Sequence, residues 1–574
     1  MQFDLVIRGG TLVDGSDNPA RIADIAVVGD TIVEISSVDS GSIIGTAKEE
    51  IDATGLIVTP GFIDLHTHLD AQISWDPQLS PLTWHGVTTA LLGNCGVTFA
   101  PCKPDDRGTL AAMMETVEDI PKRAIMEGLS WQWETYGEYL DALETLHPSI
   151  NVAGLVGHCA LRYYVMGERA VEGQPTEDEL KEMAQIAEQA VKDGAIGFST
   201  SRLLMHYLPD GRNVPGTHAD HRELIEIGKR VAAHGGLMQN VMNFHTAVES
   251  ELELLASQAR TGCRVLFSAG ARDTPEFSNQ LITALAAHRE EGLDIHAVAI
   301  PRSGGYLSNL HSTFLIELLS KFMDCSPTWQ QLFAKPFPQR LAALADEKFV
   351  DALVEEAEVY NRRNNGELDN EYRRLRWLGD GSHPDYSAAS KSLLELANIA
   401  GIEPSRCWLR MMKESEGKTT FNYHLFNTSL DNLRDVITTD WCMPGLGDAG
   451  AHVGQVMDCG WATFTLSYWH RDRSVYTLEE AVRRITSVPA HVMGLTDRGT
   501  LKVGAKADIN VIDIERLSEC YPEFAYDFPN GAGRFIQRAK GYRATICNGQ
   551  LVLENDELTG AQAGSVLRHH KPPR

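Results

Sequence analysis

Two histidines separated by one residue are the first side chains in this sequence that point to metal chemistry. Residues 61–68 (GFIDLHTH) follow a proline and begin as an apolar strand. Alternate residues of a strand face the same side, so the imidazoles of His66 and His68 can reach one ion. Two solvated histidines would give the same pattern, but the position at the end of an apolar strand favours metal ligands.

A carboxylate near the other end of the chain is the natural partner of these histidines. Asp448 lies in the glycine-rich segment 445–452 (GLGDAGAH), after an apolar run at 435–440 that we interpret as a strand. A carboxylate that touches both a metal ion and a water molecule can accept the proton of that water. We therefore predict that Asp448 is the final metal ligand and the catalytic base, although aspartate is also common in such turns.

The elements that must position these residues are eight apolar runs that alternate with amphipathic helical stretches. Strand and helix in alternation predict parallel pairing with right-handed crossovers, and eight units fit a closed α/β barrel, the (β/α)8 or TIM type. Active sites of such barrels lie at the carboxyl ends of the strands. The expected strands lie in VTPGFIDLHTH, VTTALLGNCG, NVAGLVGH, GAIGFST, GLMQNVMNF, CRVLFSAG, DIHAVAIP and DVITTD.

Both ends of the chain carry a different pattern. Residues 3–14 and 22–36 alternate apolar and polar residues around Gly-Gly and Gly-Asp, which predicts short β-hairpins, and 507–513 and 543–553 repeat the pattern. We expect a small β-sandwich domain from 1–58 and 497–574, and a catalytic barrel from 59–496. An insertion at about 306–430 separates the seventh and eighth strands and is either a lid or specificity element or a solvated helical excursion.

Composition narrows the class of protein. The chain has 574 residues, 43% hydrophobic and 22% charged, with a formal net charge of −27 and no long basic run, so nucleic acid is not an expected partner. No apolar run is long enough for a membrane span and no signal peptide is evident, which predicts a cytoplasmic protein without a membrane partner.

The ten cysteines are expected to be free thiols. A homo-oligomer is compatible with the sequence, but no feature demonstrates one.

The order of these motifs resembles the amidohydrolase superfamily over nearly the whole chain. The segments that carry the resemblance are PGFIDLHTH, HGVTTALLGNCG, GDAGAH and DRGTLKVGAKADINVID. Within it, residues 93–96 (GNCG) are similar to the D-aminoacylase, or N-acyl-D-amino-acid deacylase, branch, as are 157–162 (GHCALR), 195–200 (AIGFST) and 564–568 (GSVLR). The resemblance implies that Cys95 is a zinc ligand, and thiolate suits zinc. It also implies that His158 supports the scissile carbonyl or the developing oxyanion.

The sequence departs from that branch at the fifth and sixth strands, where D-aminoacylases carry metal-binding histidines. Here 235–243 (GGLMQNVMN) and 265–270 (VLFSAG) contain none; Val241 and Ala269 or a neighbour take their places, and His245 is the only nearby substitute. Either one metal is held by His66, His68 and Asp448 with help from Cys95 or His245, or the site is too poor in ligands to hold zinc tightly. We favour one zinc ion, since three protein ligands and a water suffice; a second zinc or another divalent ion stays open.

Substrate contacts are less defined. Arg162 and Arg302 are candidate clamps for a substrate carboxylate, with structural ion pairing as the equal alternative. Gln239 and Asn240, at the end of the fifth strand, are further candidates. The three histidines of the fourth strand-to-helix connection are interpreted as surface or packing residues: His206, His218 and His221.

These residues predict an enzyme that hydrolyses a carbon–nitrogen bond of a small-molecule amide, most simply an N-acyl (D-)amino acid, with metal-activated water. Asp448 would take the proton and return it to the leaving amine. A cyclic amide, a lactone or a xenobiotic amide is the alternative substrate within the same chemistry. Because the fifth and sixth strands lack the metal-binding histidines, a non-enzymatic alternative also stays open: an inactive barrel that acts in binding or assembly.

Overall fold

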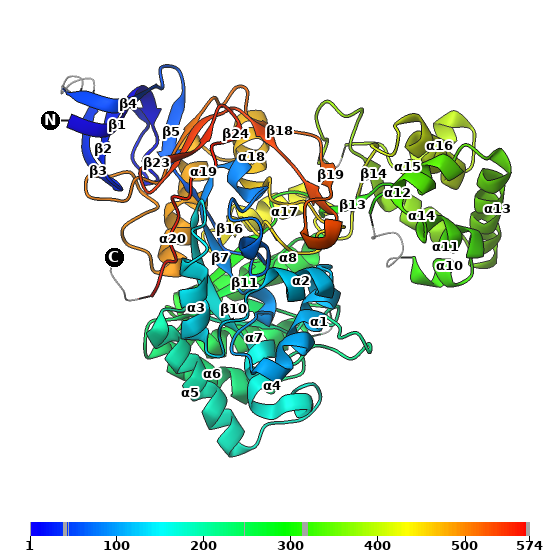
Figure 1. Ribbon diagram of the computed structural model, residues 1–574, viewed down its shortest axis with the longest axis horizontal. Helices are drawn as coiled ribbons and strands as arrows, with labels where there is room; N and C mark the ends of the chain where they lie inside the picture. Colours follow the sequence, from blue (N-terminus) through cyan, green and yellow to red (C-terminus); the bar gives the residue numbers. More distant parts are fainter. Residues whose placement is uncertain are drawn as a thin grey trace.

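A parallel eight-stranded sheet forms the centre of the computed structural model, which describes residues 2–37, 43, 45–245, 247–312, 319–387 and 389–569. Its strands pair in the order β16-β12-β11-β10-β9-β8-β7-β6 and curl into a barrel (Figure 1). A parallel bridge between Thr67 and Ala449 joins the two ends of this order. The strands are β6 (Phe62–Asp64), β7 (Val87–Leu92), β8 (Asn151–Gly157), β9 (Gly197–Ser201), β10 (Leu237–Val241), β11 (Arg264–Ala269), β12 (Ile295–Ala299) and β16 (Cys442–Pro444).

The predicted barrel class is confirmed, but the eighth strand was placed wrongly. Residues 435–440 form the end of helix α17 (Leu430–Ile437) and the turn after it, and the strand is the short β16. Leu430, Leu433 and Val436 are buried on one face of α17, and Ser429 caps its first turn by accepting from the Asn432 amide. Helical spacing and a cap therefore override the apolar run that suggested a strand.

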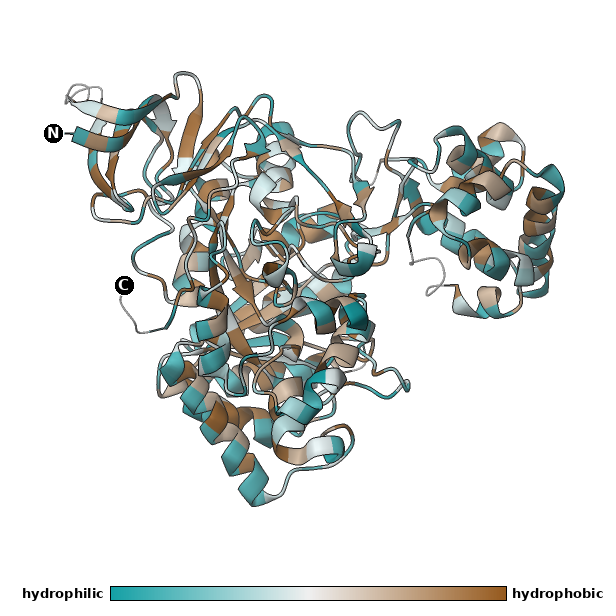
Figure 2. Ribbon diagram, in the orientation of Figure 1, coloured by the Kyte–Doolittle hydropathy of each residue, from teal (hydrophilic) through white to brown (hydrophobic). Residues whose placement is uncertain are grey.

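Apolar side chains close the barrel interior below its mouth. They come from most of the strands and from the residue before β9: Ile63, Leu91, Leu155, Ile196, Leu237, Leu266, Val298 and Met443. The strands are buried on both faces, as expected for a parallel sheet covered by helices. Figure 2 shows these strands as largely hydrophobic, whereas the outer helices mix both colours. Among the helices are α1 (Arg107–Glu118), α4 (His158–Met166), α5 (Glu177–Asp193), α6 (His221–Ala232), α7 (Val248–Ala259), α8 (Pro275–Glu290), α19 (Leu478–Ile485) and α20 (Ser487–Met493).

Both ends of the chain build one mixed sheet of nine strands, here called the end sheet. Its order is β24-β23-β22-β17-β5-β1-β2-β3, with β4 paired to β1. The predicted hairpin at 22–36 is β2 and β3, but 3–14 is the single strand β1 with an irregularity between Ile7 and Gly10. The strands are β1 (Gln2–Leu12), β2 (Arg21–Val28), β3 (Thr31–Ser37), β4 (Thr46–Asp52), β5 (Ile57–Pro60), β17 (Ile509–Ile512), β22 (Tyr542–Cys547), β23 (Gln550–Glu554) and β24 (Glu557–Leu558).

Between β12 and β16 the chain forms a lobe of helices that projects to one side in Figure 1. Its apolar residues, among them Trp329, Leu353 and Trp408, pack in a cluster separate from the barrel core. The sheet β13-β15-β14 belongs to the same segment. In the part of the chain that the structure describes, no helix is long and apolar enough to cross a membrane. The lobe contains β13 (Tyr306–Ser308), β14 (Leu375–Trp377), β15 (Phe421–Tyr423), α10 (Ser320–Asp324), α11 (Pro327–Phe333), α12 (Phe337–Ala343), α13 (Glu347–Arg363), α14 (Glu367–Arg374), α15 (Leu393–Ala400) and α16 (Pro404–Glu414).

Candidate metal centre

The carboxyl ends of β6, β7 and β16 bring His66, His68, Cys95 and Asp448 to one place at the barrel mouth. The two histidines lie just beyond β6, and their backbone is tied to the loop after β16. The His68 amide donates to the Ala449 carbonyl at 2.7 Å, and the Asp448 amide donates to the His66 carbonyl at 3.1 Å. Closure of the barrel therefore places ligands from opposite ends of the chain side by side.

The donor atoms of His66, His68 and Cys95 lie at the spacing of ligands that share an ion, and Asp448 lies beside the two histidines. One donor atom from each of His66, His68 and Cys95 lies within 4.8 Å of the others. The Cys95 Sγ is 3.3 Å from His66 Nε2, and Asp448 Oδ1 is 3.3 Å from His66 Nε2 and 3.8 Å from His68 Nε2. Nitrogen or oxygen ligands about 2.1 Å from a tetrahedral zinc ion stand about 3.4 Å apart. Two imidazoles, a thiol and a carboxylate are thus a donor set that fits zinc.

Two of these residues adopt a backbone conformation that side chains rarely take. Cys95 has φ 56° and Asp448 has φ 45°. Such residues cost of order 1–3 kcal/mol each and gather at functional sites. The strained turn at Cys95 is held by hydrogen bonds from its amide to Gln239 Oε1 at 3.3 Å and from the Gly96 amide to Ser199 Oγ at 3.0 Å.

Glu118 lies beside His68, although no sequence motif points to it. It is the last residue of α1 and is 1% exposed, with one carboxylate oxygen 3.1 Å from His68 Nδ1. Burial, and then the carboxylates of Asp448 and Asp70, raise the pKa of Glu118 well above its usual range. A metal-binding histidine commonly gives its second ring N–H to a carboxylate, and Glu118 is placed for that role beside His68.

The protonation states at the mouth favour a bound cation. Burial, with the nearby His206, lowers the pKa of His66 to about 3, so its imidazole is neutral and able to bind a metal. Burial, with Glu118 and Asp448, raises the pKa of the Cys95 thiol well above its usual range. A divalent ion reverses this effect, because it stabilises a thiolate directly. Burial also raises the pKa of Glu118 and Asp448, so a cation bound beside these groups would stabilise their ionised forms.

His206 is the one histidine of its connection that lies near the ligands. It is 6% exposed, and its Nδ1 is 3.0 Å from Ser201 Oγ. Burial is the main cause that lowers the pKa of His66 and His68, and His206 is a smaller cause of both shifts. His206 is therefore not a surface histidine, in contrast to one of the two expectations from the sequence. Its place in the loop after β9 is the sequence feature that points to the site, because that loop borders the barrel mouth.

The structure places His158 in a buried network with both ring nitrogens engaged. Its Nδ1 is 2.8 Å from Thr200 Oγ1, and its Nε2 is 2.7 Å from Glu223 Oε1. Arg162 donates to the second oxygen of Glu223 at 2.5 Å and to the Ala170 and Gly173 carbonyls. Gly96, next to Cys95, packs closely against this network, since a Cβ on Gly96 would lie 3.4 Å from that of His158.

Three further residues predicted for the site, Arg302, Asn240 and His245, lie outside the ligand cluster. Arg302 is fully buried; it pairs with Asp458 and Glu519 and stacks on Tyr386, 3.6 Å from the ring centroid. Both arginines thus follow the alternative of structural ion pairing. Asn240 faces outward and exchanges two hydrogen bonds of 2.9 Å with Gln258 on α7. His245 is exposed beyond β10 and is outside the ligand cluster.

The fifth and sixth strands, which lack the histidines of D-aminoacylases, carry inward-facing polar residues instead. Gln239 on β10 accepts from the Cys95 amide, and its Nε2 is buried without a partner among the described residues. Ser268 on β11 places Oγ 3.4 Å from His66 Nδ1. These strands therefore supply support for His66 and Cys95 in place of further imidazole ligands.

Comparison with known families agrees with this geometry. A family model described as the amidohydrolase family matches residues 49–299 and 398–553. The chain belongs to the amidohydrolase family. The match leaves out 300–397, which includes helices α10 to α14 of the lobe. The match therefore spans all eight barrel strands and only part of the end sheet, including β5, β17 and β22.

Individual relatives cover almost the full length. The chain is 27% identical over 580 residues to the D-aminoacylase of Alcaligenes xylosoxydans xylosoxydans, covering 98% of this chain and 97% of that protein. It is 30% identical to the N-acyl-D-glutamate deacylase of the same organism, covering 90% and 89%. The crystal structure of the N-acyl-D-glutamate deacylase from Bordetella bronchiseptica, complexed with zinc and a phosphonate inhibitor, matches with a TM-score of 0.66, 25% identity, and 99% and 100% coverage.

Proposed function

We propose that this amidohydrolase cleaves the amide bond of an N-acyl-D-amino acid or a related small molecule, with one zinc ion at the barrel mouth. The observation that carries the proposal is the convergence of His66, His68, Cys95 and Asp448 at ligand spacing. The D-aminoacylase and the N-acyl-D-glutamate deacylase support the substrate class.

Each residue has a distinct role in this proposal. A zinc ion held there would polarise the scissile carbonyl and lower the pKa of water. Asp448 accepts the proton of the attacking water and returns it to the nitrogen of the leaving amine. Both ring nitrogens of His158 are engaged, so His206 donates the hydrogen bond to the carbonyl oxygen as charge develops. Glu118 holds the His68 ring in the tautomer that leaves Nε2 free to bind.

A substrate without a free carboxylate is the second candidate. Arg162 and Arg302, the residues proposed to hold a carboxylate, are both committed to buried ion pairs. A cyclic amide, a lactone or a neutral xenobiotic amide would not need them. A panel that pairs N-acetyl-D-amino acids with the corresponding amino amides and lactones separates the two candidates by kcat/KM.

The first experiment is elemental analysis of the purified protein together with that substrate panel. We expect the zinc content per chain to fall by about one equivalent in Cys95→Ala and to be unchanged in His245→Ala, because His245 is exposed and outside the cluster. A protein without metal after zinc supplementation would contradict the proposal and favour a binding role.

The role of Asp448 is tested by Asp448→Asn. We expect kcat to fall by about 10²–10⁴-fold, the contribution typical of a general base. Asp435→Asn is the matched control, because Asp435 is exposed at the end of α17 and contacts only Arg434 among the described charges. Wild-type kcat in Asp448→Asn would rule out the proposed base.

A further inference from the structure

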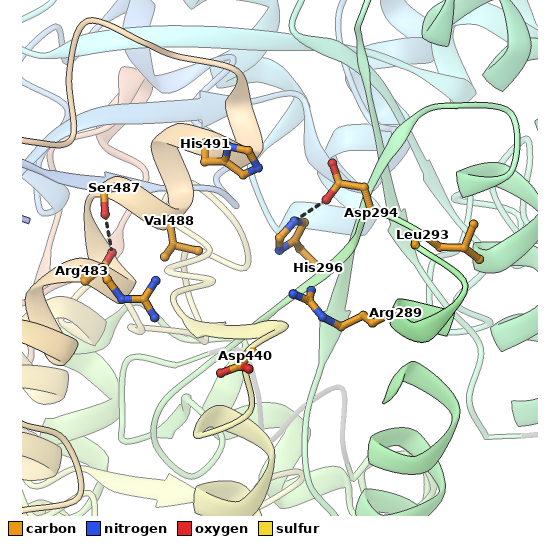
Figure 3. Close-up of a pocket in the computed structure, with 10 residues that line it drawn as sticks. Arg289, Leu293, Asp294, His296, Asp440, Arg483, Ser487, Val488 and His491 are labelled. Carbon is orange, nitrogen blue, oxygen red and sulfur yellow. Dashed lines mark hydrogen bonds and ion pairs between the residues drawn. The ribbon is translucent and has the colours of Figure 1, made fainter. Parts of the chain in front are cut away.

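A second cluster of metal-binding side chains lies at the opposite end of the barrel from the mouth. Strand β12 runs from Ile295 to Ala299, and the mouth lies at its carboxyl end. At its amino end the surface is hollowed by a cavity of about 650 Å³ lined by Asp294, His296 and His491 (Figure 3). Nothing in the proposed hydrolysis uses these three residues.

The three side chains stand at a spacing close to that of a shared ion. One donor atom from each lies within 4.8 Å of the others. Asp294 and His296 are two apart, so both face the same side of the extended chain, as in the pair His66 and His68. His491 comes from α20, and its ring centroid is 6.2 Å from that of His296. Asp294 and His491 are at least partly exposed and can turn to close the remaining distance.

His296 is the buried member of this cluster, and one of its ring nitrogens is unpaired among the described residues. The residue is 7% exposed and lines the cavity. Its Nε2 is 2.8 Å from Asp294 Oδ1, whereas its buried Nδ1 has no hydrogen-bond partner among the described residues. A buried ring with one uncommitted nitrogen costs free energy unless something satisfies it.

Hydrogen bonds from Arg264 hold the backbone next to the cluster, and the charged residues that line the cavity balance one another. Arg264 donates to the His491 carbonyl at 2.7 Å and to the Gly235 carbonyl at 3.0 Å, which anchors the backbone of α20. Two arginines and one further aspartate line the cavity, and Arg483 is already paired with Glu480. With Asp294, the four charged lining residues balance, so a cation that enters the cavity does not face a net positive charge from its lining.

We propose that Asp294, His296 and His491 form a second metal site, for a divalent ion of the zinc class. Two imidazoles and one carboxylate are a common zinc donor set, and the cavity leaves room for water as the fourth ligand. A bound ion would tie the start of β12 to α20, and α20 precedes the return of the chain to the end sheet at β17. The site is therefore structural, and it is independent of the proposed hydrolysis at the mouth.

The test is the zinc stoichiometry of the full-length protein, measured by titration against a chromophoric chelator. We expect two sites in the wild type and one in His491→Ala and in Asp294→Asn. The Cys95→Ala variant should keep the second site while the mouth site weakens. His383→Ala is the matched control, because His383 is exposed and outside both clusters.

Thermal unfolding gives a second readout that does not need an activity. Added zinc should raise the unfolding midpoint of Cys95→Ala, because an ion that binds only the folded state stabilises it, and this rise should be lost when His491→Ala is added. Equal zinc stoichiometry in the wild type, His491→Ala and Asp294→Asn would overturn the second site. That outcome would leave the mouth site, and the proposed hydrolysis, untouched.

Discussion

The imidazole of His68 lies between two carboxylates, and this position decides which of its nitrogens can bind a metal. Its Nε2 faces Asp448 at 3.8 Å, and its Nδ1 faces Glu118 at 3.1 Å. If Nε2 binds the ion, Nδ1 must carry the proton. Glu118 Oε1 lies beside Nδ1, and neither atom has another hydrogen-bond partner among the described residues, so we expect Glu118 to accept that proton once a metal is bound. We therefore expect Glu118 to affect metal binding only through its contact with His68.

We predict that Glu118→Gln weakens zinc binding at the mouth by about 10–100-fold, the usual effect of removing a carboxylate that supports a metal ligand. Competition with a chelator measures the dissociation constant. Glu115→Gln, one turn earlier on the exposed face of α1, should bind zinc like the wild type. Equal affinity in both variants would show that Glu118 does not orient His68.

Local motifs identify ligands, but they do not identify the residues that support them. His66 and His68 are predicted from their spacing, and Cys95 is predicted from the resemblance of its segment to D-aminoacylases. Glu118 sits fifty residues further along the chain than His68, on a helix with no motif of its own, so only the fold reveals the contact. The roles of His158 and Arg302 depended on whether Glu223 and Glu519 were near, which a sequence does not show.

At the scale of elements, His85 joins three segments from distant parts of the chain. It ends the short helix η3 (Leu82–His85), and its Nδ1 lies 2.8 Å from Thr463 Oγ1 on α18 (Trp461–Phe464). Its Nε2 lies 3.1 Å from the Gln537 carbonyl. The ring is fully buried, and burial lowers its pKa to about 3.

This contact predicts a pH dependence of stability. Between pH 6.5 and 3 the unfolded chain binds a proton at His85 that the folded protein does not, so stability falls as the pH falls through this window, by about 1.4 kcal/mol per pH unit. In His85→Gln this loss should be absent. The difference between the thermal midpoints of wild type and variant, largest at pH 7, should shrink towards pH 4.

His383→Gln, at an exposed site, should keep the wild-type slope of midpoint against pH. If His85→Gln also keeps it, the ring of His85 is not held neutral by its burial. That result would place the acid sensitivity in other groups.

Most elements of the barrel were predictable, because its strands are continuous apolar runs. The failure at the eighth strand has a physical cause. β16 has three residues, too few for a periodic signal, and it follows a helix whose last turn is as apolar as a strand. The bulged strand β1 was taken for a hairpin because Gly9-Gly10 gives the same signal in a turn and in a bulge.

At the scale of the whole molecule, the lobe has a hydrophobic core of its own. Trp408 is 3% exposed in that cluster, which is separate from the barrel core. The sequence predicted an excursion between the seventh and eighth strands, but its core could not be predicted, since packing partners there are up to a hundred residues apart.

We predict that Trp408→Ala destabilises the lobe by about 3–5 kcal/mol while zinc content at the mouth is unchanged. Calorimetry should show that the unfolding transition of the lobe moves to lower temperature, while the unfolding transition of the barrel keeps its midpoint. Ile399→Ala, at a site on α15 that is 70% exposed, is the control and should move neither. A single transition that shifts as a whole would mean that lobe and barrel unfold together.

The end sheet also sets the order in which the protein can fold during synthesis. Strand β5 pairs with β17, and the cluster that covers this sheet joins Leu5 and Ile25 to Val511 and Ile546. At about 5–20 residues per second, a ribosome needs roughly 20–90 seconds to make the intervening chain. The first strands therefore wait with an uncovered apolar face while the barrel emerges, and this interval is when a nascent chain most needs a chaperone.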